Sequence, residues 1–227
     1  MTLHALAPNL WHAQHQFSVF GIQASSRMTV VRFANGQLWL HSPIRLTPEL
    51  QAAVSNLGEV TWLVAPSKMH HLFVGDWQQA FPQAKLYGPR GLARKRPDLT
   101  TLQPLPEQAL PEWADELLQL PIRGIPAMGE SVWLHRASET LILTDLCMWI
   151  MGDVPASSRA YASLMGVRKA PNVSRLVRFV TRDKPAARDS VRQMLQWPIL
   201  RVILGHNTVL EQDAKATLQQ ALSWFER

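Results

Sequence analysis

The chain is poor in cysteine and in long apolar runs. It has a single cysteine, Cys147, so no internal disulfide can form and nothing indicates an oxidising compartment. Its first residues contain no basic segment followed by an apolar one, unlike a signal peptide. The most apolar stretch, residues 141–151, contains Asp145 and is too short to span a bilayer. We therefore predict a cytoplasmic protein that does not associate with a membrane.

Glycine-rich phosphate loops, dinucleotide-binding fingerprints and internal repeats are also absent from the sequence. Acidic residues are fewer than basic ones, 17 against 23, which gives a net charge of +6. Much of the basic excess lies in residues 90–96 and 168–192. An excess of this sign is typical either of a solvated basic surface or of a protein that binds an anionic substrate or partner.

The second basic region contains a predicted helix over residues 172–182. Helical spacing would place Arg175, Arg178 and Arg182 on one face. No nucleic-acid motif accompanies them, and Phe179 is the only aromatic residue among them, so nucleic acid is a disfavoured partner. Three arginines are costly to bury without partners, so we expect this face to be partly exposed and outside the active cleft.

The 227 residues suffice for one large domain or two small ones, and we predict a single domain over residues 1–227. Its first half is rich in strand patterns, with extended segments at residues 10–17 and 18–22. Asn35-Gly36 between two apolar runs predicts a hairpin with a type I′ turn, in which both residues have positive φ. Thr47 and Pro48 then predict the start of a helix that ends before Gly58.

The remaining chain alternates between short apolar runs and amphipathic stretches. Further strands are predicted at residues 28–33, 37–41, 60–65, 84–87, 116–122, 131–135, 140–144 and 199–204, and further helices at 72–81, 158–165, 173–182, 185–195 and 211–225. The proline-rich stretch 99–111 is predicted to be a surface connection. Mixed sheets covered by helices on their outer faces satisfy this order of elements.

Candidate metal ligands stand where predicted strands end. His41 follows one strand, His70 and His71 lie in the loop after another, and Asp145 and His206 each follow a further strand. Imidazole and carboxylate are suitable ligands for zinc, iron or manganese. Each residue also has an ordinary interpretation, as a helix cap, a turn residue or a packed loop residue. Their shared position at strand ends favours a common site.

The same positions carry a resemblance to the metallo-β-lactamase-like superfamily. Residues 38–42 resemble its early strand, residues 64–71 lie where it has T-H-x-H-x-D-H, and residues 124–131 resemble its G-H-T-P-G-S segment. Residues 141–145 are similar to the strand that ends in the metal-bridging aspartate, and residues 203–206 to the final strand and histidine. His41-Ser42-Pro43, residues 70–73 and Arg182-Asp183-Lys184 look like an uncharacterised branch known only as a domain of unknown function. The resemblance implies an αββα sandwich, with two mixed sheets between outer helices.

The departures from that pattern imply a reduced metal site. Pro66, Lys68 and Pro126 replace the three histidines that hold the first metal in the superfamily, and neither proline nor protonated lysine can ligate one. For the second metal, the superfamily pattern is retained at His71, Asp145 and His206. The implied ligand set is His70, His71, Asp145 and His206, where His70 replaces the usual aspartate. The resemblance thus implies one divalent ion, zinc, iron or manganese, or none.

Three functions are consistent with these features of the sequence. The first is a metal-dependent hydrolase that uses one ion, with Asp145 and His70 as catalytic residues and Lys68 and His41 as substrate-binding residues. Its substrate would be a small molecule, and Lys68 could bind an anionic group of it. The second is a non-catalytic binding protein that keeps the fold without its metals. The third, binding of an anionic polymer through the arginine-rich helices, lacks a supporting motif.

Overall fold

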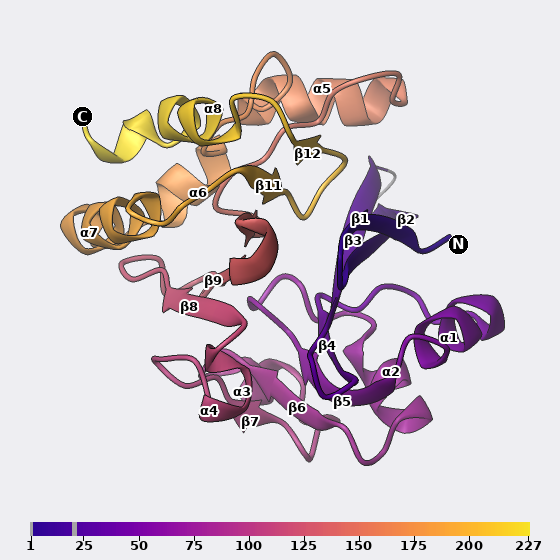
Figure 1. Ribbon diagram of the computed structural model, residues 1–227. Helices are drawn as coiled ribbons and strands as arrows, with labels where there is room; N and C mark the ends of the chain where they lie inside the picture. Colours follow the sequence, from indigo (N-terminus) through magenta and orange to yellow (C-terminus); the bar gives the residue numbers. More distant parts are fainter. Residues whose placement is uncertain (1, 20–21) are drawn as a thin grey trace. The chain divides into compact units, whose positions relative to one another are not determined.

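A computed structural model describes residues 2–19 and 22–227, and the described residues form two mixed β-sheets with helices (Figure 1). The larger sheet has the order β1-β2-β3-β4-β5-β6-β7 and the smaller one β12-β11-β10-β9-β8. Strands β4 to β7 run parallel to one another, as do β10 and β11. Two mixed sheets with helices confirm the predicted class. Part of the predicted extended segment, residues 20–21, lies outside the described residues.

The strands are short apart from β2 and β3. Their bounds are β1 His4–Ala7, β2 Leu10–Val19, β3 Ile22–Arg32, β4 Gln37–His41, β5 Glu59–Val64, β6 Lys85–Gly88, β7 Gln103–Pro104, β8 Leu117–Pro121, β9 Ser131–His135, β10 Thr140–Ile142, β11 Arg201–Ile203 and β12 Val209–Leu210. The α-helices are α1 Pro48–Ser55, α2 Val74–Ala80, α3 Leu92–Lys95, α4 Pro111–Ala114, α5 Ala156–Met165, α6 Arg175–Val180, α7 Lys184–Leu195 and α8 Ala214–Ala221.

The chain groups into two compact units. The first comprises residues 1–15 and 26–106, and the second residues 16–25 and 107–227. Each unit has its own cluster of buried apolar side chains. Strands β2 and β3 each begin in one unit and end in the other. The single domain predicted over residues 1–227 stays a prediction.

Helices α1 and α2 of the first unit lie on one side of β4 and β5 (Figure 1). Thr47 caps α1 as predicted: its Oγ1 accepts a hydrogen bond from the N–H of Leu50 at 3.3 Å, and Pro48 stands in the first turn. Leu50 and Val54, one helical turn apart, are fully buried against the sheet. Both the cap and the apolar stripe could be predicted from the sequence.

The turn between β3 and β4 differs from the predicted type I′ turn. Gly36 has a φ of +82°, but Asn35 is not among the residues with positive φ. The N–H of Gly36 donates to Phe33 at 2.9 Å, and the N–H of Phe33 donates to Gln37 at 2.9 Å. The loop therefore contains one left-handed residue, as in hairpins that combine a type I turn with a bulge. The strand pairing was correct and the turn type was wrong.

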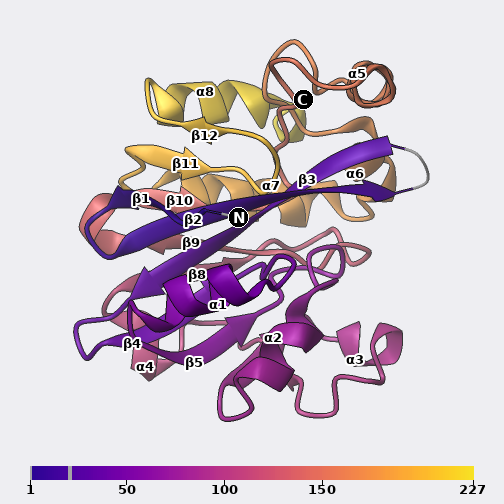
Figure 2. The same ribbon diagram turned by 90° about the vertical axis from the view of Figure 1, so that its right-hand side faces the viewer.

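The second unit is built around the five-stranded sheet, in which every residue of β9 and β10 is buried. Helix α8 runs alongside β11 and β12 (Figure 2), and α7 packs against β8. Gly124 lets the segment after β8 approach α7, because a Cβ there would stand 1.9 Å from the carbonyl oxygen of Asp183. The N–H groups of Arg182 and Asp183 donate to the Gly124 carbonyl at 2.9 and 3.1 Å and fix the start of α7.

The basic helix is shorter than predicted. Ser174 caps α6 by accepting a hydrogen bond from the N–H of Val177, and the helix ends at Val180, so Arg182 lies beyond it. Arg175 and Arg182 are exposed, while Arg178 is half-buried and donates to the Asn172 side chain at 2.7 Å. Partial exposure is confirmed, but the arginines do not share one helical face.

The short elements were the ones missed. Strands β1, β7 and β12 and helices α3 and α4 have at most four residues each, too few to show a period. The predicted C-terminal helix is divided, because α8 ends at Ala221 and a 3₁₀ turn, η2 Ser223–Phe225, follows. None of the helices in the described part of the chain is both long and apolar enough to cross a membrane.

Candidate metal centre

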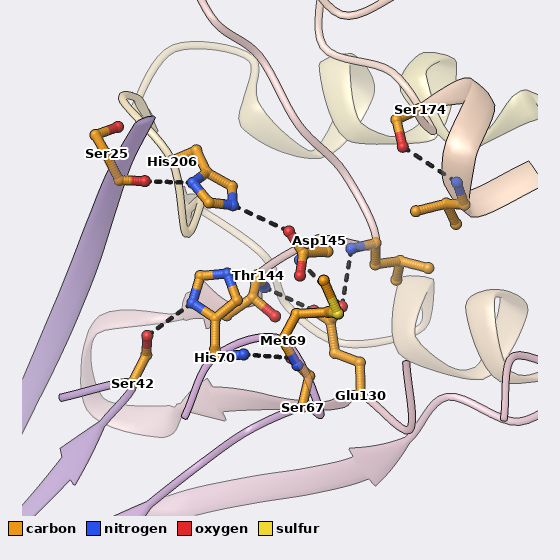
Figure 3. Close-up of polar contacts among 12 residues, drawn as sticks. Ser25, Ser42, Ser67, Met69, His70, Glu130, Thr144, Asp145, Ser174 and His206 are labelled. Carbon is orange, nitrogen blue, oxygen red and sulfur yellow. Dashed lines mark hydrogen bonds and ion pairs between the residues drawn. The ribbon is translucent and has the colours of Figure 1, made fainter. Parts of the chain in front are cut away.

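The loop after β5, residues 66–71, is held by hydrogen bonds at both ends. The Oγ of Ser67 accepts from the N–H groups of Met69 and His70, each at 3.2 Å (Figure 3). Two cations at the end of α3 donate to carbonyls of the same loop: Lys95 to Lys68 at 2.8 Å, and Arg96 to His71 at 2.8 Å. The polypeptide that carries His70 is thus fixed from two directions within the first unit.

His70 is oriented by Ser42, which follows β4. The Ser42 Oγ lies 2.8 Å from Nδ1 of His70, and both side chains are buried (Figure 3). Ser42 has a φ of +52°, an uncommon conformation for a residue with a side chain, and its N–H donates to Val64 at 2.9 Å. When Nδ1–H donates to Ser42, the lone pair of Nε2 is available to a metal, the usual support for a histidine ligand.

His41, predicted to bind substrate, is only 1% exposed. Its ring stacks on Trp39 with centroids 5.4 Å apart. Burial, and then the charge that His70 can carry, hold the pKa of His41 well below its usual value, so the imidazole is neutral. A role in contact with substrate stays a prediction, and the burial of the side chain argues for packing instead.

His71 has a different partner. Nη1 of Arg96 lies 3.2 Å from Nδ1 of His71, and burial followed by the charges of Lys95 and Arg96 lowers the pKa of His71 to about 4. A guanidinium can only donate, so Nδ1 accepts and Nε2 carries the proton of the neutral ring. A ring in that state has no lone pair left for a metal. Ligation by His71 therefore stays a prediction, and it would require this contact to break.

In the second unit, the buried carboxylate of Glu130 holds the loop that carries Asp145. Its oxygens accept hydrogen bonds from three consecutive N–H groups, those of Thr144 at 2.6 Å, Asp145 at 3.0 Å and Leu146 at 2.9 Å (Figure 3). Burial and the neighbouring Asp145 carboxylate raise the pKa of Glu130, whereas the three N–H donors favour its ionised form. The loop after β10 is clamped at the residue where the predicted ligand stands.

His206 lies in the loop between β11 and β12 and faces Asp145. Its Nε2 lies 3.0 Å from Oδ1 of Asp145, and its Nδ1–H donates to the carbonyl of Ser25 (Figure 3). Burial alone would lower the pKa of His206, but the hydrogen bond to Asp145, the charge of Asp145 and the Ser25 carbonyl together raise it. Because a carbonyl can only accept, Nδ1 must carry a proton. In the contact with Asp145 a proton lies between Nε2 and Oδ1, so Nε2 offers its lone pair to a metal once that proton has left.

Each unit thus presents ligand atoms in a suitable state. The first offers His70, and the second offers Asp145 and His206 as a pair. Lys68, the predicted substrate-binding residue, stands in the same loop as His70 and is half-buried. Sequence reasoning missed Ser25, Ser42, Arg96 and Glu130. For Glu130 a sign existed, because this acidic residue stands close before the apolar run 132–134.

Comparisons with known proteins agree with this arrangement of elements. A metallo-β-lactamase from Pontibacter korlensis shares 12% identity over 100% of this chain and 99% of its own, with a TM-score of 0.67. One from Erythrobacter litoralis shares 14% over 99% and 95%, with a TM-score of 0.68. The metallo-β-lactamase FIM-1 from Pseudomonas aeruginosa, in its mono-zinc form, shares 10% over 99% and 94%, with a TM-score of 0.66. At such identities the likeness establishes the fold alone, and the predicted metallo-β-lactamase fold is confirmed.

The family assignment comes from a separate comparison. No curated protein matches the chain. The family model described as "Domain of unknown function (DUF4336)" matches residues 8–172 and so covers strands and loops of both units. A match over this much of the sequence makes the chain a member of the DUF4336 family, and that family is here seen to take the metallo-β-lactamase fold.

Proposed function

We propose that this protein is a metal-dependent hydrolase of small molecules that uses one divalent ion, held by His70, Asp145 and His206. Each of the three offers one ligand atom, an imidazole nitrogen or a carboxylate oxygen. The observation that carries the proposal is the pairing of His206 with Asp145 while the Ser25 carbonyl fixes the proton on Nδ1. This is the tautomer that a histidine ligand needs.

The donor set suits a single ion and not two. Pro66, Lys68 and Pro126 stand where the superfamily pattern has the first set of histidines, and none of them can replace such a ligand. Two neutral imidazoles and one carboxylate are a common ligand set for zinc in hydrolases. An ion bound by them would lower the pKa of a bound water and polarise an ester, amide or phosphate oxygen. The mono-zinc form of FIM-1 offers a precedent for one ion on this fold.

The protein's own residues would prepare the site before any ion binds. Glu130 keeps the Asp145 loop in place, Ser42 orients the His70 ring, and the Ser25 carbonyl orients His206. Asp145 can also hold a proton at Oδ1, where it already contacts Nε2 of His206. His71 and Arg96 serve in this scheme as support for the loop, because their mutual contact uses the lone pair of His71.

A second function has an observation of its own. His206 and Asp145 satisfy each other at 3.0 Å, so that pair needs no ion to be stable. One carboxylate is also little negative charge with which to neutralise a divalent cation. A non-catalytic binding protein on the same fold is therefore the alternative, and metal content separates the two functions.

Metal analysis of the freshly purified protein tests the proposal. We expect close to one equivalent of zinc, iron or manganese, and hydrolysis of ester, amide or phosphate substrates that a chelator abolishes and added metal restores. His206→Gln and Asp145→Asn should each weaken zinc binding more than about a hundredfold, because each removes a ligand and not merely its support. His4→Gln, which changes an exposed histidine, is the matched control and should bind zinc like the wild type.

Two outcomes would contradict parts of this proposal. A protein that stays free of metal at saturating zinc, with unchanged stability, is the non-catalytic binding protein. If zinc binds but His70→Gln leaves its affinity unchanged, His70 is not a ligand, and the ion is held by the second unit alone.

A further inference from the structure

Gly91 lies between β6 and α3, in a segment of the chain that is rich in cations. Residues 85–98 contain five cations, Lys85, Arg90, Arg94, Lys95 and Arg96, against one carboxylate, Asp98. Asp98 is committed to Arg96, with Nη2 and Oδ2 2.6 Å apart. The segment therefore presents a positive potential to its surroundings.

Two of the cations in this part of the first unit converge on one point above Gly91. The position that a Cβ of residue 91 would occupy lies 3.5 Å from Nη2 of Arg94 and 3.6 Å from Nζ of Lys68. These groups come from different segments, the loop after β5 and helix α3. An ammonium and a guanidinium that approach one point from different segments offer an oxyanion charged donors from two directions.

The backbone keeps this point open. Gly91 has a φ of +86°, in the left-handed region that favours glycine, and it carries no side chain to fill the space. The Lys95 side chain, next to Arg94 in the sequence, donates to the carbonyl of Lys68 at 2.8 Å. This hydrogen bond joins α3, which carries Arg94, to the loop that carries Lys68. The two segments are therefore held together before any ligand arrives.

We propose that this point binds an oxyanion, the carboxylate or phosphate group of a small-molecule substrate, between the Lys68 ammonium and the Arg94 guanidinium. An oxygen placed there lies within 3.6 Å of both nitrogens. Guanidinium presents a planar fork of donors and ammonium a compact charge, and both are suited to oxyanions. Lys68 stands two residues before His70 in one loop. The role as a substrate subsite rests on the proposed hydrolase function, whereas binding of the anion does not.

Calorimetric titration of chelator-treated protein with inorganic phosphate tests the binding. Arg94→Gln and Lys68→Gln should each weaken it about tenfold, because each removes one charged hydrogen-bond donor. Gly91→Ala should weaken it at least as much although both cations remain, because the methyl group occupies the place of the oxygen. Arg32→Gln, at an exposed arginine of the same unit, makes the same change in net charge and should leave phosphate binding unchanged.

Comparison of ligands identifies the preferred group and the source of binding. Stronger binding of phenylphosphonate than of benzoate assigns a phosphate substrate, and stronger binding of benzoate assigns a carboxylate. Either result supports the subsite if Arg94→Gln weakens the binding of the preferred ligand. Equal weakening by Arg32→Gln and Arg94→Gln overturns the proposal, because the attraction is then due to net charge. Binding of a short oligonucleotide but not of inorganic phosphate also overturns it. Because these titrations need no metal, their result is independent of whether the protein is a hydrolase.

Discussion

A neutral histidine has one lone pair to offer, and its hydrogen-bond partner decides which nitrogen carries it. The Ser25 carbonyl requires a proton on Nδ1 of His206 and so leaves Nε2 able to ligate. Arg96 does the opposite at His71, where it donates to Nδ1 and leaves the proton on Nε2. Two histidines that the sequence pattern treats alike are thus suited to different roles, and the distinction lies in residues far from either in the chain.

His12 should make the stability of the protein depend on pH. Its Nδ1 lies 2.8 Å from Nη1 of the buried Arg27, and its ring lies 5.6 Å from that of His4. Burial, then the charge of Arg27 and that of His4, lower the pKa of His12 to about 4. Above pH 6.5 the imidazole is neutral in both the folded and the unfolded chain. Below it the unfolded chain takes up the proton first, so the free energy of unfolding should fall between pH 6.5 and 4.

Urea unfolding at several pH values checks this prediction. His12→Gln keeps a hydrogen-bond acceptor for Arg27 but cannot titrate, so its free energy of unfolding should fall less steeply between pH 6.5 and 4. Some slope should remain, because the pKa of His71 is also lowered to about 4. Parallel curves for the variant and the wild type would show that His12 is not the group responsible.

At the scale of elements, the loop that carries Asp145 is held by the side-chain carboxylate of Glu130, where hydrogen bonds to other backbone groups would be expected. Three consecutive N–H groups after β10 donate to Glu130 and would lose this partner without it. Buried donors that lack a partner cost about 1–3 kcal/mol each. Glu130 therefore contributes first to the fold and, through the position of Asp145, to the proposed metal site.

Substitution of Glu130 should destabilise the protein and displace Asp145. In Glu130→Gln the amide NH₂ faces at least one backbone N–H, so we expect a loss of about 2 kcal/mol in the free energy of unfolding. Glu107→Gln removes the same charge from an exposed side chain of the same unit and should change stability by less than about 0.5 kcal/mol. Chemical denaturation measures both. Equal stabilities would mean that the loop finds other partners for its N–H groups.

Some elements and site residues were predictable because their signals are local. The Thr47-Pro48 start of α1 and the apolar period of its buried face lie within one short segment, and His70, Asp145 and His206 follow apolar runs that read as strands. The partners of these residues were not predictable in the same way. Ser25 is 181 residues from His206 and Ser42 is 28 from His70, so only the folded chain brings them together. The Asn35-Gly36 dipeptide predicted the wrong turn type, because the type of this turn depends on the bulge and not on the dipeptide alone.

At the scale of the whole molecule, the question is whether the two compact units unfold together. Strands β2 and β3 pass through both, and the family match over residues 8–172 does not stop at the boundary between them. A strand that belongs to two units cannot lose its pairing in one without disturbing the other. We therefore propose that the chain unfolds as one cooperative domain, as the superfamily resemblance also implies.

Cavity-forming substitutions in each core test this cooperativity. Leu40 in the first unit and Leu141 in the second are both fully buried. Leu40→Ala and Leu141→Ala should each lower the free energy of unfolding by about 2–5 kcal/mol. If the chain is one domain, each variant unfolds in a single transition, and tryptophan fluorescence and far-ultraviolet circular dichroism give the same lowered midpoint. If the units are independent, each substitution moves only one of two transitions and leaves the other at the wild-type midpoint, and residues 1–227 are then two domains.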